Sequence, residues 1–278
     1  MDFLLRGDAP FSDELWEKID ETVVNKAKEQ LVGRKFIPVY GPLGAGVQSI
    51  NLDLFNIDND TVISSNGEED TELVKVQGRR YVEIPMIFKD AFISWRDYEN
   101  SKQTGLLLDL APIAITAAAC AHKEDQIIFF GNEEWGYRGL MNVEGRQTLQ
   151  KSNWNEGENA FTDIAAGLEK LVRKGFYGPY VLVLSPDLYA QLQRIQPGTG
   201  KLELERIREL IDGKVYQTPI LGSNKAVLLQ KGMENMDLVI GQDLATGYIG
   251  PEKLNHVLRI LETILLRIKR PESIVTFE

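Results

Sequence analysis

The feature that most constrains this chain is a polar stretch at residues 51–85, which has too few apolar residues for a core of its own. Within it, Val62-Ile63 precedes Asn66-Gly67, a dipeptide typical of a tight hairpin turn. Val74 and Val76 then alternate with polar residues, as successive residues of a strand do. The pattern predicts a long two-stranded hairpin. Isolated hairpins are marginally stable in water, so this arm needs a partner, and a neighbouring subunit is an economical one.

The segment before the arm has the signals of an amphipathic helix at residues 12–31. Ser12 is a favourable N-cap, and Asp13 and Glu14 follow where the helix dipole favours acidic residues. Apolar residues recur every four positions on one face: Leu15, Ile19, Val23, Ala27 and Leu31. Gly33 supplies a C-terminal stop. This face either packs only on the core of its own chain or also receives a partner.

A second helix, at residues 109–130, is expected at the centre of the fold. Asp109 is its expected cap, Pro112 suits its first turn and Gly131 ends it. One face collects residues at helical spacing: Ile113, Ala117, Cys120, Glu124 and Ile128. The pattern after this helix, from residue 161 onward, predicts alternating helices and strands. It has expected helices at 161–174, 185–195 and 202–211, and expected strands at 180–184, 226–229, 238–240 and 258–268, with a short end piece at 274–275.

Charge and hydropathy exclude two classes of partner. The chain has a formal net charge of -10, whereas phosphate contacts need Lys and Arg, so we expect no nucleic acid partner. No apolar stretch approaches the roughly 18 residues of a membrane span, and no membrane partner is expected. The N-terminus lacks the basic start and apolar run of a secretory signal. A cytoplasmic protein is therefore expected.

A search for a reaction centre finds no complete motif. His122 and His256 lack the spacing of a metal site and have no adjacent nucleophile, so we expect a solvated helix turn for His122 and a surface or interface role for His256. Cys120 lies among alanines, which favours a small buried residue over a nucleophile. Gly198-Thr199-Gly200-Lys201 imitates the end of a Walker motif, but Leu202 replaces the hydroxyl residue that binds magnesium. We expect no cofactor, no metal and no enzymatic activity, and we expect the many carboxylates to face solvent.

Several segments, in the same order along nearly the whole chain, resemble the encapsulin family. They are Met1-Asp2-Phe3-Leu4 with Ala9-Pro10, Gln30-Leu31-Val32-Gly33-Arg34-Lys35-Phe36, Tyr40-Gly41-Pro42-Leu43-Gly44, Glu124-Asp125-Gln126-Ile127-Ile128-Phe129-Phe130-Gly131, Gly139-Leu140-Met141, Gly178-Pro179-Tyr180 and Gly241-Gln242-Asp243-Leu244-Ala245-Thr246-Gly247-Tyr248. The resemblance implies an α+β fold, that of tailed-phage major capsid proteins, with a peripheral domain, an axial domain and an extended loop.

The resemblance also implies how the chain divides. Residues 1–50 would be the N-terminal helix and arm that join the peripheral domain, and residues 51–85 the extended loop hairpin. Residues 86–134 would be the peripheral domain with its central helix, 135–232 the axial domain, and 233–278 a return to the peripheral domain. The extended loop coincides with the hairpin that the residues alone predict to need a partner.

The function implied by the resemblance is that of a self-assembling icosahedral shell, an encapsulin nanocompartment of 60, 180 or 240 copies. Such a shell encloses a cargo enzyme by binding the cargo's C-terminal targeting peptide on its inner wall. A ferritin-like iron-storage oxidase is the cargo we favour, and a peroxidase is the other typical one. The size of the shell stays open.

The resemblance places the cargo peptide at the first helix and nearby segments. The expected peptide-binding residues are Val23, Arg34, Phe36, Leu244 and Tyr248. Pro38 stands where some family members carry an acid, which puts a shared polar contact there in doubt. On this basis Val23→Asp is expected to empty the shell without preventing assembly. The expected pore-lining loop is Gln196, Pro197, Gly198, Thr199, Gly200 and Lys201, although an ordinary connection between helices explains it equally well.

Two other functions share parts of this pattern. A phage or prophage major capsid protein would have the same fold, but a DNA-filled head favours basic residues and this chain is acidic. A protease fused to the capsid fold would need a Ser/His/Asp or Cys/His arrangement, which we do not find in the sequence.

Overall fold

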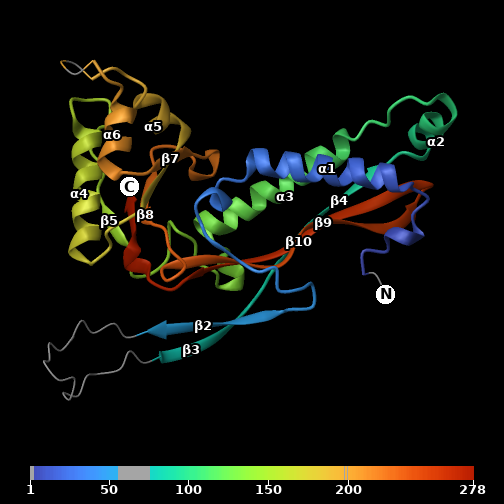
Figure 1. The fold of residues 1–278 in the computed structure, drawn as a ribbon, viewed down its shortest axis with the longest axis horizontal. Coiled ribbons are helices and arrows are strands. Elements are labelled where there is room, and N and C mark those ends of the chain that lie inside the picture. The colour runs from blue at the N-terminus through green and yellow to red at the C-terminus, as the bar shows by residue number, and fades with distance from the viewer. Residues whose placement is uncertain (1–2, 56–75, 197, 199) are drawn as a thin grey trace, which may run out of the picture.

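The computed structural model describes residues 3–55, 76–196, 198 and 200–278 (Figure 1). One half of the molecule holds a four-stranded sheet in the order β1-β9-β10-β4, with α1 and α3 packed on it. The elements of this half are β1 (Val39–Tyr40), β4 (Met86–Ile93), β9 (Met236–Glu252), β10 (Asn255–Ile268), α1 (Asp13–Gln30), α2 (Trp95–Thr104) and α3 (Ala111–Phe130). In the part of the chain that the structure describes, no helix has both the length and the apolar character needed to cross a membrane.

The first helix forms as predicted because its cap and its apolar stripe agree. The Ser12 hydroxyl accepts a hydrogen bond from the Leu15 amide, and the stripe residues Ile19 and Val23 are buried where α1 packs on α3. The predicted cap of α3 is wrong by one position. Leu110 occupies the N-cap, and because Pro112 has no amide to be capped, Asp109 instead accepts from the Ala111 amide at 2.9 Å.

Two features of the four-stranded sheet exceed what the sequence predicts. β9 spans 17 residues and β10 spans 14. The two strands pair with each other, so backbone hydrogen bonds between them hold even their polar stretches in extended conformation. Register shifts around Thr263 accommodate the pairing.

The helix α2 was not predicted, because it is polar and buries only Tyr98 among its residues. Ser94 nevertheless caps it by accepting from the Asp97 amide.

The other half holds a five-stranded sheet in the order β5-β11-β8-β6-β7 with three helices beside it (Figure 1). Its elements are β5 (Gln147–Leu149), β6 (Tyr180–Leu184), β7 (Lys214–Gln217), β8 (Ala226–Gln230), β11 (Ile274–Phe277), α4 (Asn159–Arg173), α5 (Pro186–Gln191) and α6 (Glu203–Ile211). A second apolar core surrounds Trp154, Phe176 and Phe277. α5 is shorter than predicted, because the chain turns to form a bridge between Ile195 and Leu202. β11 lies in this five-stranded sheet, although residues 233–278 were expected to return to the peripheral domain, so that segment ends in the half of the molecule that holds the five-stranded sheet.

The predicted arm is present as the antiparallel pair β2 (Ser49–Phe55) and β3 (Val76–Glu83), which extends away from both sheets (Figure 1). Its base packs through Ile50 and Val82 on a small apolar cluster. Farther out, Arg79 pairs with Asp53 at 2.7 Å, and Tyr81 is exposed. The predicted turn at Asn66-Gly67 lies outside the described residues.

Candidate functional site

Arg34 lies in the short 3-10 turn η2 (Gly33–Lys35) that follows α1, and its guanidinium faces three carboxylates. Its Nε and Nη2 atoms donate to the two oxygens of Glu124 at 2.7 and 2.8 Å. Nη2 also donates to Glu262 at 2.8 Å, and Nη1 donates to Asp243 at 2.7 Å. The side chains of Glu124 and Glu262 are 0% and 1% exposed, whereas Asp243 is exposed. Arg34 is thus held from inside by two acids and meets solvent through the third.

Two of these acids contradict the expectation that carboxylates face solvent. Glu262 is buried because β10 pairs with β4 and places it near Glu124 and Arg34. Burial raises the pKa of Glu262 well above its usual value, and repulsion by Glu124 adds to the rise while Arg34 opposes it. The sequence held one signal of this burial, since Glu124 falls on the apolar stripe of α3.

Asp125 anchors the backbone of the same turn. Its two carboxylate oxygens accept the amides of Val32 at 2.8 Å and Gly33 at 2.9 Å. Burial raises the pKa of Asp125 to about 6, against the lowering effect of these two hydrogen bonds. Gly33 permits the close approach, because a Cβ there would lie 2.5 Å from Ile128 Cδ1. Two successive acids of α3 therefore fix the turn that carries Arg34.

The structure divides the five residues predicted to bind a cargo peptide. Arg34 and the partly buried Leu244 come together at the C-terminal end of α1, where Leu244 packs on Ala27 and Leu31. Phe36 is buried and stacks on Tyr216 of β7, at the five-stranded sheet. Tyr248 is buried near the opposite end of α1 against Phe11. Their contact with a peptide stays a prediction.

The expected outcome of Val23→Asp needs correction. Val23 is 2% exposed and belongs to the main apolar core. An aspartate there would place an unpaired charge among apolar side chains, which costs several kcal/mol. The substitution therefore tests the stability of the fold, and loss of cargo from this variant would not identify a docking residue.

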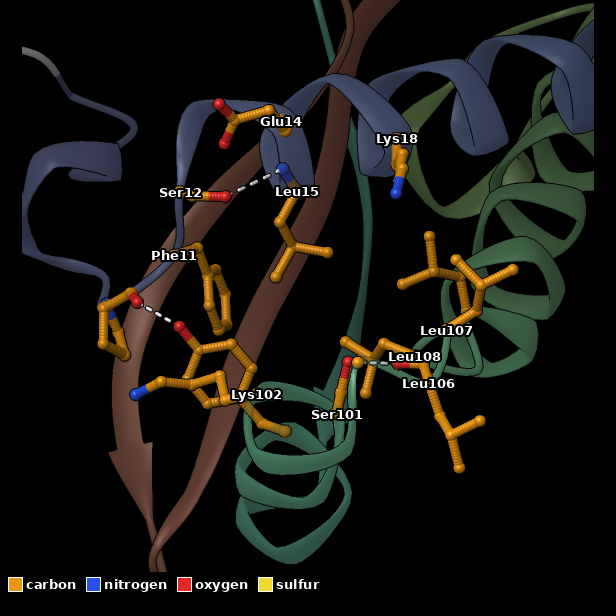
Figure 2. A pocket seen from close by; sticks show the side chains of 14 residues that line it. Phe11, Ser12, Glu14, Leu15, Lys18, Ser101, Lys102, Leu106, Leu107 and Leu108 are labelled. Atoms are coloured by element: carbon orange, nitrogen blue, oxygen red, sulfur yellow. Dashed lines mark hydrogen bonds between the residues drawn. The ribbon is translucent and has the colours of Figure 1, made fainter.

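A groove lies at the N-terminal end of α1, between that helix, α2 and the loop at residues 105–110. Its volume is about 590 Å³, and Figure 2 shows Phe11, Leu15, Leu107 and Lys18 facing it. Lys102 also lines the groove, with its ammonium group over the Tyr98 ring. Leu107 is 86% exposed. The groove is built firmly on one side, because the Tyr98 hydroxyl donates to the Pro10 carbonyl and the Ser101 hydroxyl donates to the Leu106 carbonyl. An apolar surface with cations at its rim suits a short peptide with apolar and acidic side chains.

The predicted pore loop connects α5 and α6. The Gln196 amide donates to the Lys201 carbonyl at 3.0 Å, and Lys201 pairs with Glu209 of α6 at 2.7 Å. Gly198 and Gly200 have positive φ angles of 81° and 68°, which glycine adopts readily. Pro197 and Thr199 lie outside the described residues. The role of the loop in a pore stays a prediction.

The two histidines and the cysteine lie in surroundings that favour a structural role over a catalytic one. His122 is exposed and contacts Gln126 one turn along α3, as expected. His256 is partly buried, and its ring packs edge-on against Phe11 and Tyr98. Cys120 is buried as predicted, and burial raises its pKa to about 12, which disfavours the nucleophilic thiolate. No group of His, Cys, Asp and Glu suited to a metal ion occurs among the described residues.

The chain is similar to curated shell proteins over nearly its whole length. It is 41% identical over 277 residues to a type 1 encapsulin shell protein of Myxococcus xanthus, covering 100% of this chain and 96% of that one. A diheme-cytochrome-encapsulin shell fusion protein of Kuenenia stuttgartiensis is 38% identical and is matched over 95% of this chain and 73% of its own length. A ferritin-like-encapsulin shell fusion protein of Pyrococcus furiosus is 25% identical, with 95% and 68% covered.

Solved structures show the same fold. A virus-like particle from Pyrococcus furiosus matches with a TM-score of 0.78 and 23% identity over 95% of this chain and 100% of that chain. The capsid of the myovirus XM1 matches with a TM-score of 0.66 and 12% identity, over 87% and 88% of the two chains. The predicted capsid-protein fold is confirmed. Residues 1–265 match the family described as "Encapsulating protein for peroxidase", and the chain belongs to this family of encapsulin shell proteins.

Proposed function

We propose that this chain is the subunit of a cytoplasmic nanocompartment, a closed icosahedral shell that encloses a cargo enzyme and has no catalytic activity of its own. The main support is the match to a shell-protein family along residues 1–265, together with an arm that has little core of its own. The arm can bury its exposed surface, which includes Tyr81, against another chain.

The outer face of β4 offers a second surface for assembly. Phe88 and Phe92 are 51% and 54% exposed, and Met86 beside them is also exposed, whereas Ile87, Ala91 and Ile93 of the same strand are buried. Arg259 pairs with Asp90, which lies between Phe88 and Phe92 along the strand, and its guanidinium lies over the Phe88 ring at 4.2 Å, so a paired charge lies within this face. Exposed apolar patches mark protein interfaces. We propose that a neighbouring copy covers this face.

Negative-stain electron microscopy of the purified full chain tests the shell. We expect closed, uniform particles, whose diameter fixes the number of copies. A preparation that contains only monomers or dimers at the concentrations of normal expression would refute the proposed function.

The cargo's targeting peptide is proposed to dock along α1, with the groove at Phe11, Leu15 and Leu107 as its apolar seat. Exposure of the apolar Leu107 side chain to water is unfavourable, and a bound peptide would bury it. Lys18 and Lys102 at the rim would attract an acidic residue of the peptide. Arg34 offers a further contact if a peptide carboxylate replaces the exposed Asp243 on Nη1.

Leu107→Asp is expected to weaken binding of a cargo targeting peptide at least about tenfold, because covering a leucine is worth about 1.5–3 kcal/mol. Leu254→Asp is the matched control, since Leu254 is 71% exposed in the turn between β9 and β10 and lies outside the groove. Fluorescence anisotropy with a labelled peptide and assembled particles measures both variants. Equal affinities for the two would remove the groove from the docking site.

A ferritin-like iron-storage oxidase is the cargo we propose. The ferritin-like fusion relative and the peroxidase named in the family description support the two candidate classes. Mass spectrometry of particles purified from the native host distinguishes them. An iron oxidase in stoichiometric amounts supports the first class, and a peroxidase in its place would contradict it.

A further inference from the structure

Glu124 of α3 and Glu262 of β10 converge on one atom of Arg34. The guanidinium Nη2 donates to Oε2 of each carboxyl group at 2.8 Å, so the two carboxyl groups meet at a single nitrogen atom. Both side chains are buried, and Glu262 Oε1 finds no hydrogen-bond partner within the described part of the chain. Two carboxylates this close repel each other, and a shared proton relieves the repulsion.

The groups around the pair do not supply enough positive charge for two ionised acids. By element they are Arg34 and Lys35 of the turn, Cys120 and Asp125 of α3, Lys89 and Asp90 of β4, and Asp243 of β9. Lys35 is exposed and acts on Asp125, and the charges of Lys89 and Asp90 oppose each other. Among the described residues, the guanidinium of Arg34 is therefore the one cation that contacts three carboxyl groups, two of which are buried.

We propose that Glu124 and Glu262 share one proton at neutral pH and that this proton fastens the turn after α1 to α3 and β10. In the protonated pair, the hydroxyl of one carboxyl group donates to the other, and Arg34 balances the single remaining charge. Without the proton, Glu124, Glu262 and Asp243 compete as three anions for one guanidinium. The repulsion then loosens the turn, so Glu262 acts as a positioning residue for Arg34.

The direction of the pH dependence follows from the proton's preference for the folded chain. Burial raises the pKa of Glu262, so the folded chain holds this proton more tightly than the unfolded chain does. The stabilisation is complete below the unfolded pKa of about 4.3 and is lost as the pH rises through the folded value. Burial of Asp125 also makes stability fall as the pH rises, but the pKa of Asp125 is about 6, so this effect lies at lower pH. Loosening above neutral pH therefore reports on the shared proton.

Hydrogen exchange of the assembled full-length protein tests the proposal between about pH 7.5 and pH 9, above the titration of Asp125, after correction for the intrinsic exchange rate. In the unsubstituted protein, the amides of Val32 and Gly33 should exchange about tenfold faster at the upper pH, which corresponds to one unit of pKa coupling. Glu262→Gln should remove this dependence. Its amide reproduces the donor and the acceptor of a protonated carboxyl group and cannot ionise in this range.

Asp243→Asn is the matched control, because it changes the exposed acid on Arg34 and leaves the buried pair intact. Its pH dependence should persist, with a midpoint moved slightly lower, since the charge of Asp243 adds to the rise in the pKa of Glu262. Infrared difference spectroscopy gives a second readout. A protonated carboxyl band at neutral pH should be present in the unsubstituted protein and absent from Glu262→Gln. The proposal fails if that band is missing from the unsubstituted protein, or if Glu262→Gln keeps the full pH dependence of exchange.

Discussion

Arg34→Met is expected to lower the free energy of unfolding by about 3–5 kcal/mol, the cost of removing one partner from a buried charged network. Methionine keeps most of the aliphatic packing, so the loss falls on electrostatics. The buried Glu124 carboxylate loses its two-point contact with Nε and Nη2, and Glu262 loses the cation that offsets its burial. Chemical denaturation followed by circular dichroism measures the change, with the protein concentration held fixed because assembly adds to stability.

Two further variants identify the cause of that loss. Asp243→Asn should cost no more than about 1 kcal/mol, because exposed ion pairs contribute little. Combining Arg34→Met with Glu124→Gln and Glu262→Gln should recover most of the stability, since neutral side chains remove the unpaired buried charge. If Arg34→Met costs no more than Asp243→Asn, the three-carboxylate cluster does not stabilise the fold.

Local signals in the sequence were sufficient for α1 and α3. α1 has a cap, an apolar stripe and a stop that agree with one another, and the structure reproduces its bounds to within one residue. The arm was predictable for the opposite reason, since a hairpin with few apolar residues has little core of its own to pack on. α2 has a cap at Ser94, but its single buried residue, Tyr98, gives no periodic stripe to detect.

The parts that sequence reasoning missed depend on contacts between distant segments. Glu262 is buried because it meets Arg34, 228 positions away in the chain, and no local pattern marks that pairing. The same applies to the length of β9, whose polar middle is a strand because β10 lies beside it. Val23 and Phe36 were predicted as contact residues from a family resemblance, which fixes their position in the fold but says little about how deeply each side chain is buried.

The double substitution Phe88→Asp and Phe92→Asp is expected to abolish particle formation while the subunit stays folded. Both side chains are half exposed on β4, so the cost within one chain is small. Between chains the cost is large, because each subunit would have to bury two unpaired carboxylates, at several kcal/mol per ion. Analytical ultracentrifugation detects the loss of particles, and circular dichroism establishes that the fold is kept.

The pair Phe88→Leu and Phe92→Leu is the control for this experiment, since it keeps the face apolar and changes mainly its shape. It should assemble, with at most a modest loss of particle stability. Because a closed shell repeats the same contact in every subunit, a local penalty is multiplied over the whole particle, and assembly should fail abruptly instead of by degrees. Normal particles from the aspartate variant would mean that β4 faces solvent in the shell. The arm would then have to supply the contact between neighbours without this surface.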